Sequence, residues 1–478
     1  MKLKIKPRLY QEEIFGKAVN ENTLVVLPTG LGKTLIALMM ALYHLPKGNV
    51  LVLAPTKPLV EQHLKSFVAN SDLKEEDCAL VTGAVRPEER SQMYLKKIVF
   101  ATPQTIRNDI IAGRINLNNF SLIVFDESHK AVGNYAYCFI ASQFNGRKLG
   151  LSASPGTDAE SIKQVCNNLN LTRIEWRTEK DPDVRPYLKS KRINYINLEL
   201  PDEFREIIRL LKRSLSSCLK ELKERGFIET HDINKVFKRD LLKLQQQAVK
   251  DKAYVALSLN AKALKVMHAL ELLQTQGIDS LKKYFEGLKN QKAKATRQLL
   301  RDVDFQQAMH LAFKTKEEHP KYKALLDILK PGKTYLIFTQ YRATAEQITK
   351  LVGDGARLFV GQRGVNGMSQ KEQLEILNSF RNGEFNILVS TSISEEGLDI
   401  PKIDTAIFFE PVPSALRTVQ RKGRVGRAKA GEIFVLVTKG TVDEKYKWVA
   451  YYKEKKMKEA IKNLSRKDLV QSSLESYL

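Results

Sequence analysis

Short apolar runs alternate with helical segments along the first part of the chain, up to about residue 180. The runs are rich in leucine or β-branched residues and end in polar or turn residues, which is typical of strands buried on both faces. The expected strands are 23–27, 50–54, 98–101, 122–125 and 148–151, and the expected helices include 34–44 and 59–68. This alternation predicts a parallel sheet with helices on both faces.

The same alternation returns after Pro331 and predicts a second α/β domain. Its expected strands are 334–338, 357–360, 386–389, 405–409 and 433–437. The stretch between Pro201 and Pro320 differs, because no proline falls inside it, its glycines are few and its apolar residues recur at helical spacing. Such a composition predicts a module of long helices.

The predicted fold class is therefore α/β, with two parallel-sheet domains and an all-helical insert domain between them. The expected boundaries are 1–184 for the first domain, 185–325 for the insert, 326–445 for the second domain, and 446–478 for a C-terminal helix and tail. The length of 478 residues agrees with this division, since a domain takes about 150 residues.

The formal net charge of +24 favours a polyanionic partner, most commonly nucleic acid, over a generally basic soluble protein. Charge does not distinguish DNA from RNA. The four cysteines are far apart and form no CxxC pair, which argues against a zinc site or a disulfide framework. No apolar run reaches about 18 residues, the length that a membrane span needs. We expect a soluble intracellular protein.

The segment 28–34 reads PTGLGKT, follows an expected strand and opens an expected helix. Gly30 and Gly32 let the backbone N–H groups turn toward phosphate oxygens, and the helix N-terminus favours anions. Lys33 would reach the β and γ phosphates, and Thr34 would offer its hydroxyl to Mg²⁺. Leu27 stands where the full GxxxxGK[ST] pattern has its first glycine, so the loop is a variant. We expect ATP here, with Thr29 and Leu31 completing the loop, rather than a plain glycine turn.

The segment 122–129 reads LIVFDESH and forms an apolar strand that ends in two carboxylates and a histidine. Asp126 at the strand tip can hold Mg²⁺. Glu127 is placed to orient or deprotonate the attacking water. His129 is a candidate sensor of the γ phosphate, with a satisfied turn residue as the less favoured alternative. A DESH segment about 92 residues after a phosphate loop is a strong signal of ATP hydrolysis.

These two motifs resemble those of DExH-type superfamily 2 helicases, whose two motor domains are RecA-like. The resemblance implies that Arg8 and Gln11 read adenine, and that Ser152 and Ser154 couple hydrolysis to movement. It also implies a groove that follows the nucleic-acid backbone, lined from the first domain by Thr56, Lys57, Thr102 and Pro103 and from the second by Gln340 and Thr391.

The second domain also supplies the other half of the expected ATP site. By the same resemblance, Asp399 contacts the ribose, and Arg424 and Arg427 in the segment QRKGRVGR occupy arginine-finger positions. A guanidinium at the γ phosphate neutralises charge in the transition state. ATP should then close the cleft between the domains, and hydrolysis should reopen it.

Residues 126–137 read DESHKAVGNYAY, which resembles the archaeal Hef protein and the related Fanconi anaemia group M translocases. The helical insert is also similar to theirs. The resemblance implies remodelling of branched DNA, such as stalled forks and Holliday junctions, in repair and fork restart, with the insert gripping duplex near the branch. Relatives often carry a C-terminal nuclease module, for which this chain has no candidate motif.

The tail resembles a sliding-clamp-binding box, formed by Gln471, Leu474, Tyr477 and Leu478. An ordinary amphipathic tail or an interdomain linker is the alternative interpretation. Two other functions stay open at this point. One is a double-stranded-RNA-dependent ATPase or helicase, since such enzymes also carry an insert here. The other is an ATP-gated scaffold that recruits a clamp.

Overall fold

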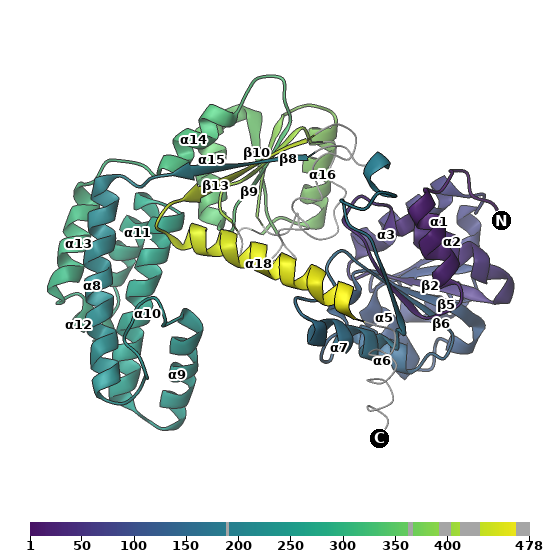
Figure 1. Ribbon diagram of the computed structural model, residues 1–478, viewed down its shortest axis with the longest axis horizontal. Coiled ribbons are helices and arrows are strands. Elements are labelled where there is room, and N and C mark those ends of the chain that lie inside the picture. The colour runs from purple at the N-terminus through teal and green to yellow at the C-terminus, as the bar shows by residue number, and fades with distance from the viewer. Residues whose placement is uncertain (188–190, 362–366, 392–402, 412–430, 465–478) are drawn as a thin grey trace.

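The first domain is built on a seven-stranded, wholly parallel sheet in the computed structural model, which describes residues 1–187, 191–361, 367–391, 403–411 and 431–464 (Figure 1). The strand order is β3-β4-β2-β5-β6-β1-β7. The strands are β1 (Thr23–Val26), β2 (Asn49–Leu53), β3 (Cys78–Val81), β4 (Ile98–Ala101), β5 (Phe120–Phe125), β6 (Arg147–Ser152) and β7 (Arg173–Trp176). The predicted strands of this domain are confirmed, and the short edge strands β3 and β7 were not predicted.

Helices cover both faces of this sheet, so its central strands are buried on both sides. The helices are α1 (Leu9–Ala18), α2 (Lys33–His44), α3 (Lys57–Asn70), α4 (Pro87–Met93), α5 (Pro103–Ile111), α6 (Ala136–Ser142) and α7 (Ala159–Leu169). One apolar core lies under α1, α2 and α3, and the other lies under α5, α6 and α7. This double burial explains why the strands read as nearly continuous apolar runs.

The second domain holds a six-stranded sheet in the order β10-β11-β9-β12-β13-β8, also parallel throughout. The strands are β8 (Lys191–Leu198), β9 (Tyr335–Phe338), β10 (Ala356–Phe359), β11 (Ile387–Ser390), β12 (Thr405–Phe408) and β13 (Gly431–Thr438). Its helices are α14 (Pro320–Ile328), α15 (Arg342–Val352) and α16 (Gln370–Arg381). The five strands predicted after Pro331 are confirmed.

The expected insert boundary at residue 185 differs from the structure. β8 comes before the helical insert in the chain, yet it pairs with β13 along its whole length, from Lys191 beside Gly431 to Leu198 beside Thr438. The residues 191–198 therefore belong to the second sheet. The second domain completes its edge with a strand from the other side of the insert, a long-range pairing that local periodicity cannot indicate.

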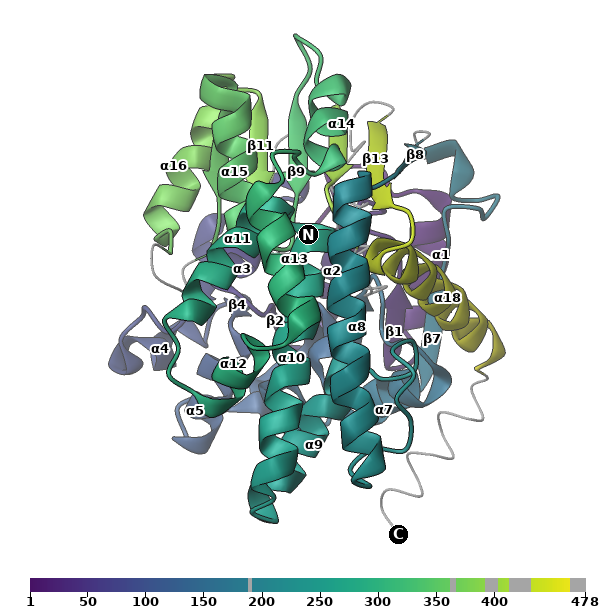
Figure 2. The ribbon, with the colours of Figure 1, turned by 90° about the vertical axis from the view of Figure 1, so that its left-hand side faces the viewer.

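The insert consists of six helices packed around a core of their own (Figure 2). They are α8 (Asp202–Glu224), α9 (Lys238–Lys250), α10 (Tyr254–Thr275), α11 (Ile278–Lys289), α12 (Lys294–Leu299) and α13 (Val303–Lys314). Apolar positions of α8 at three- and four-residue spacing, such as Phe204, Ile207, Leu211 and Leu215, are buried against α10 and α13. The prediction of a helical module is confirmed.

The helix α18 (Val442–Asn463) links the parts of the molecule. It leaves β13 of the second domain and crosses to the first domain, where Met457 and Ile461 join the core under α7 (Figure 1). At its start, the backbone N–H of Val442 donates to Gln274 of the insert over 3.3 Å. One helix thus contacts both sheets and the insert. None of the described helices is long and apolar enough to cross a membrane.

Candidate active site and nucleic-acid interface

The predicted motifs of the first domain meet at the carboxyl ends of its parallel strands. The order β5-β6-β1 places β6 between the strand that precedes the phosphate loop and the strand that precedes Asp126. Ser152 at the end of β6 therefore lies between the loop and the DESH segment. Since ligands of open α/β sheets bind outside the carboxyl ends of strands, this edge is the expected place for a nucleotide.

The phosphate loop joins β1 to α2 through two glycines in the left-handed region, Gly30 at φ 90° and Gly32 at φ 73°. Any other residue would be strained there. A Cβ on Gly32 would also overlap the side-chain amide of Gln11. Lys33 opens α2, and its Nζ donates to the carbonyl of Leu27 over 2.9 Å. The lysine is thus folded back across the loop, where an arriving phosphate would compete for it.

Gln11 is buried against the phosphate loop. Its Nε2 donates to the carbonyl of Leu31 over 3.2 Å, and its Oε1 accepts from the backbone N–H of Arg8 over 2.9 Å. The Tyr10 hydroxyl donates to the same Leu31 carbonyl over 2.8 Å. Arg8 lies over the ring of Tyr187, with 5.1 Å to its centroid. This segment supports the loop directly, while its reading of adenine stays a prediction.

Asp126 is held by a histidine that the sequence did not single out. His63 of α3 lies with Nε2 2.8 Å from Asp126 Oδ2, and both side chains are buried. Burial alone would raise the pKa of Asp126, but His63 and Lys33 outweigh it and hold the pKa below its ordinary value. The carboxylate is therefore ionised and fixed in direction. No motif marks His63; only the packing of α3 against β2, β3 and β4 places it there.

Asp126 and Thr34 fit a magnesium ion bound together with a nucleotide. Mg²⁺ usually takes one or two carboxylates and fills the remaining positions with phosphate oxygens and water. The described residues contain no cluster of three His, Cys, Asp or Glu side chains that could hold a metal by themselves. The buried carboxylate of Asp126, near Lys33, suits an ion that arrives with ATP.

The remaining DESH residues connect the carboxylates to the turn after β6. Glu127 adopts a left-handed conformation at φ 49°, which turns the chain sharply at the strand tip. Its Oε2 lies 3.3 Å from His129 Nδ1, and the Ser152 hydroxyl lies 3.4 Å from the same nitrogen. The ring of His129 therefore lies against both Glu127 and Ser152, and its role as a sensor of the γ phosphate stays a prediction.

Ser154 extends this connection to α18. Its backbone N–H donates to the Ser152 hydroxyl over 3.1 Å, and its own hydroxyl lies 3.0 Å from the sulfur of Met457. The serine pair predicted to couple hydrolysis to movement thus touches the helix that comes from the second domain. The contact with Met457 was missed, because 303 residues separate it from Ser154.

The residues predicted to follow nucleic acid lie at helix N-termini and strand ends. Thr56 stands at the N-cap position of α3, which begins at Lys57, and Thr102 at that of α5, which begins at Pro103; neither side chain makes a capping hydrogen bond. Helix N-termini present free N–H groups that suit phosphates. In the second domain, Gln340 follows β9 and Thr391 follows β11. The Nε2 of Gln340 donates to the carbonyl of Pro411 over 3.0 Å.

Several predicted residues lie outside the part of the chain that the structure describes. These are Asp399, Arg424 and Arg427 of the expected ATP site, and Gln471, Leu474, Tyr477 and Leu478 of the expected clamp-binding box. Their roles stay predictions.

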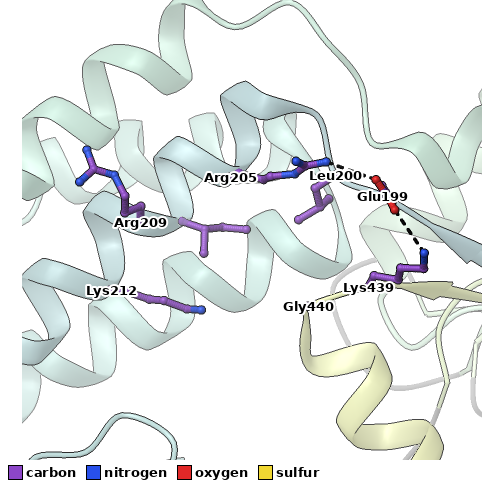
Figure 3. Close-up of a pocket in the computed structure, with 8 residues that line it drawn as sticks. Glu199, Leu200, Arg205, Arg209, Lys212, Lys439 and Gly440 are labelled. Atoms are coloured by element: carbon purple, nitrogen blue, oxygen red, sulfur yellow. Dashed lines mark hydrogen bonds and ion pairs between the residues drawn. The ribbon is translucent and has the colours of Figure 1, made fainter.

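A cavity of about 530 Å³ lies away from these motifs, between the start of α8 and the turn after β13 (Figure 3). Its lining includes the cations Arg205, Arg209, Lys212 and Lys439. Glu199 lies 3.5 Å from Arg205 and 3.2 Å from Lys439. Because much of its positive charge is neutralised and no phosphate loop borders it, this cavity is not a nucleotide site.

A parallel sheet with the nucleotide motifs at its strand ends, followed by a second parallel sheet and a linking helix, is the arrangement of a superfamily 2 helicase. Sequence comparison agrees. Residues 8–162 match the family described as "DEAD/DEAH box helicase", and residues 320–429 match "Helicase conserved C-terminal domain". Residues 203–319 match "Putative ATP-dependent RNA helicase, helical bundle".

Comparison with known proteins shows which family of superfamily 2 helicases the chain resembles. The chain is 44% identical to the crystal structure of the Pyrococcus furiosus Hef helicase domain, with a TM-score of 0.74, over 92% of this chain and 98% of that one. It is 32% identical to the mouse Fanconi anemia group M protein homolog over 92% of this chain and 25% of that protein. The chain belongs to the Hef and Fanconi anaemia group M family of superfamily 2 helicases.

Two further relatives differ in name. "Putative ATP-dependent RNA helicase MJ1505" of Methanocaldococcus jannaschii is 41% identical over 96% of this chain and 61% of that protein. "ATP-dependent DNA helicase fml1" of Schizosaccharomyces pombe is 32% identical over 92% of this chain and 58% of that protein. The chain thus spans less than two thirds of the length of these relatives.

Proposed function

We propose that this chain is an ATP-dependent DNA helicase or translocase that remodels branched DNA, including stalled forks and Holliday junctions. The observation that carries the proposal is the chain of contacts from Glu127 through His129, Ser152 and Ser154 to α18. It gives ATP hydrolysis in one domain a physical route to the other. Relatives named as DNA helicases and a Fanconi anemia group M homolog support DNA as the substrate.

In the proposed reaction, Lys33 leaves the Leu27 carbonyl and binds the β and γ phosphates, where its charge stabilises the transition state. Asp126 and Thr34 would hold the magnesium ion that neutralises the phosphate oxygens. Glu127 orients the attacking water and accepts its proton. His129 lies against both Glu127 and Ser152, so a change at the γ phosphate alters the turn after β6.

The insert is positioned to move with the second domain. Tyr341 directly follows Gln340, and its hydroxyl donates to Glu271 Oε1 of α10 over 2.7 Å. On the neighbouring helix α14, His319 Nε2 lies 3.0 Å from the carbonyl of Gln274 in α10. A change at the strand ends of the second domain is therefore transmitted to the insert. A duplex held by the insert would be displaced relative to a strand held by the motor domains.

The test is steady-state ATP hydrolysis with no nucleic acid, single-stranded DNA, duplex DNA, three-way and four-way DNA junctions, and duplex RNA. We expect the strongest stimulation with the junctions, and its loss in Glu127→Gln. Stimulation mainly by duplex RNA would favour the second candidate, an RNA-dependent ATPase, which the names of the helical-bundle family and of the archaeal relative support. No stimulation by any of them would leave an ATP-gated scaffold.

A further inference from the structure

Four exposed aromatic side chains gather where α18 crosses the second domain. On α18, Trp448, Tyr451 and Tyr452 are 51%, 57% and 60% exposed, and on the edge strand β8, Tyr195 is 44% exposed. Ring centroids lie 6.1 Å apart for Trp448 and Tyr452 and 5.6 Å apart for Tyr451 and Tyr452. Lys447 joins the two elements, since its Nζ lies 4.4 Å from the Tyr195 centroid and 5.7 Å from that of Trp448. We call these four aromatic residues the aromatic surface.

The exposure of these rings is not required by the packing of α18. The helix buries the face that carries Ala450, Met457 and Ile461. Trp448, Tyr451 and Tyr452 recur at three- and four-residue spacing on another face, so they form a contiguous stripe. A contiguous apolar patch of this kind marks an interaction site, whereas single exposed apolar residues are ordinary.

The chemistry of the aromatic surface indicates its partner. Its most exposed members are planar rings, while the aliphatic neighbours Ile193 and Val449 are each 37% exposed. Half-buried Lys447 lies among the rings, and the exposed lysines Lys453, Lys455 and Lys456 follow along α18. Planar rings stack on nucleobases whatever their sequence, and neighbouring lysines contact the phosphates. A hydrophobic protein partner would not require the positive charge. The chain as a whole carries a net charge of +24, which also favours a polyanion.

We propose that the aromatic surface binds unpaired nucleotides of a nucleic-acid strand by stacking, outside the motor groove. This inference goes beyond the proposed function, because it assigns an additional contact with the nucleic-acid strand to elements that carry no helicase motif. The surface lies at the start of the helix that ends against Ser154, through Met457. A strand that leaves the motor could therefore be held by the same helix that senses the nucleotide site.

Fluorescence of Trp448 tests the stacking directly. The chain has two tryptophans, Trp176 and Trp448, so Trp176→Phe leaves Trp448 as the only one. Titration of this variant with a short oligodeoxythymidine should quench the emission to saturation, because a stacked base quenches indole fluorescence. Rising salt should weaken the binding, since the lysines displace counterions from phosphates. Absence of quenching at low salt would overturn the proposal.

Affinity measurements separate stacking from other contacts. Tyr451→Ala with Tyr452→Ala should weaken oligodeoxythymidine binding about fivefold or more, the lower end of what stacking of one base provides. Tyr451→Phe with Tyr452→Phe keeps the rings and should retain the affinity. Tyr43→Ala is the matched control, because Tyr43 is also exposed and lies 4.6 Å from a lysine, Lys47, but on α2. Equal affinities of all these variants would contradict the inference.

The outcome is independent of the proposed function. Failure of junction DNA to stimulate ATP hydrolysis, with Trp448 still quenched, would reject the branched-DNA motor and keep the aromatic surface. Normal stimulation of ATP hydrolysis by junction DNA, without quenching of Trp448, would support the branched-DNA motor and reject the aromatic surface. Duplex DNA of the same length should quench little, because its bases are already stacked on each other; equal quenching by duplex would point to phosphate contacts alone and overturn the stacking proposal.

Discussion

Lys321 and Asp443 form a buried ion pair that ties α18 to the second domain, and its removal should be strongly destabilising. Both side chains are fully buried, and Lys321 Nζ lies 2.7 Å from Asp443 Oδ2. The Asp443 carboxylate also accepts from the backbone N–H of Thr438 over 3.0 Å. Asp443→Ala would leave the buried ammonium group without its contacting partner, with the buried Glu410, whose pKa is raised by burial to about 7, as a nearby counter-charge; breaking such a pair costs about 3–5 kcal/mol.

Replacing both partners of the ion pair should lower the free energy of unfolding by much less than the sum of the two single replacements. Lys321→Met alone leaves a buried carboxylate, again at about 3–5 kcal/mol. Lys321→Met with Asp443→Leu removes both partners of the pair, and the main remaining loss is the acceptor of the Thr438 N–H, worth about 1–3 kcal/mol. The pair should therefore behave as a unit in a double-mutant cycle.

Urea unfolding followed by Trp448 fluorescence in the Trp176→Phe background measures these free energies, because Trp448 lies on α18. Far-ultraviolet circular dichroism of the whole chain provides a second probe of unfolding. Additive single costs, or single variants within about 1 kcal/mol of the parent, would refute the reasoning that burial makes each charge depend on the other.

Three further predictions concern the site and the junction with the insert. His63→Ala should lower kcat about 10-fold or more and raise the Mg²⁺ concentration that the reaction requires, since Asp126 loses a buried hydrogen bond worth about 1.5–3 kcal/mol. His63→Gln should restore part of the lost kcat. An unchanged magnesium titration would count against the role of His63 in positioning Asp126. Tyr341→Phe should reduce the DNA-stimulated rate of ATP hydrolysis more than the basal rate, because Tyr341 links the second domain to Glu271 of the insert. An equal loss of both rates would argue for a purely structural role of Tyr341. Burial lowers the pKa of His319 from 6.5 to about 3. The neutral ring therefore contributes its full share of the free energy of unfolding above pH 6.5, and this share is lost as the pH falls toward 3. In His319→Gln the free energy of unfolding should fall less steeply with decreasing pH, and an unaltered pH profile would contradict this.

The local chemistry of the sequence determined the elements and the nucleotide motifs. Strands buried on both faces must be apolar throughout, so runs such as 122–125 identify themselves. A loop that cradles phosphate needs glycines and a lysine at fixed spacing, which is why the segment 28–34 indicates its own role. These signals lie within a few residues of each other along the chain.

Tertiary structure alone decided what depends on distant partners. β8 was not recognised, because Ile193 and Tyr195 on one face are exposed while Ile196 and Leu198 pack into the core, so no single face is apolar. His63 gains its contact with Asp126, which follows β5, only when α3 packs against β2, β3 and β4.

The same holds for the contact of Ser154 with Met457 and for the aromatic surface. Both depend on the path that α18 takes between the domains. Periodicity specifies which side of a helix is apolar, but it does not specify what lies against that side. Packing of elements far apart in sequence therefore made the link between the nucleotide site, the second domain and the insert.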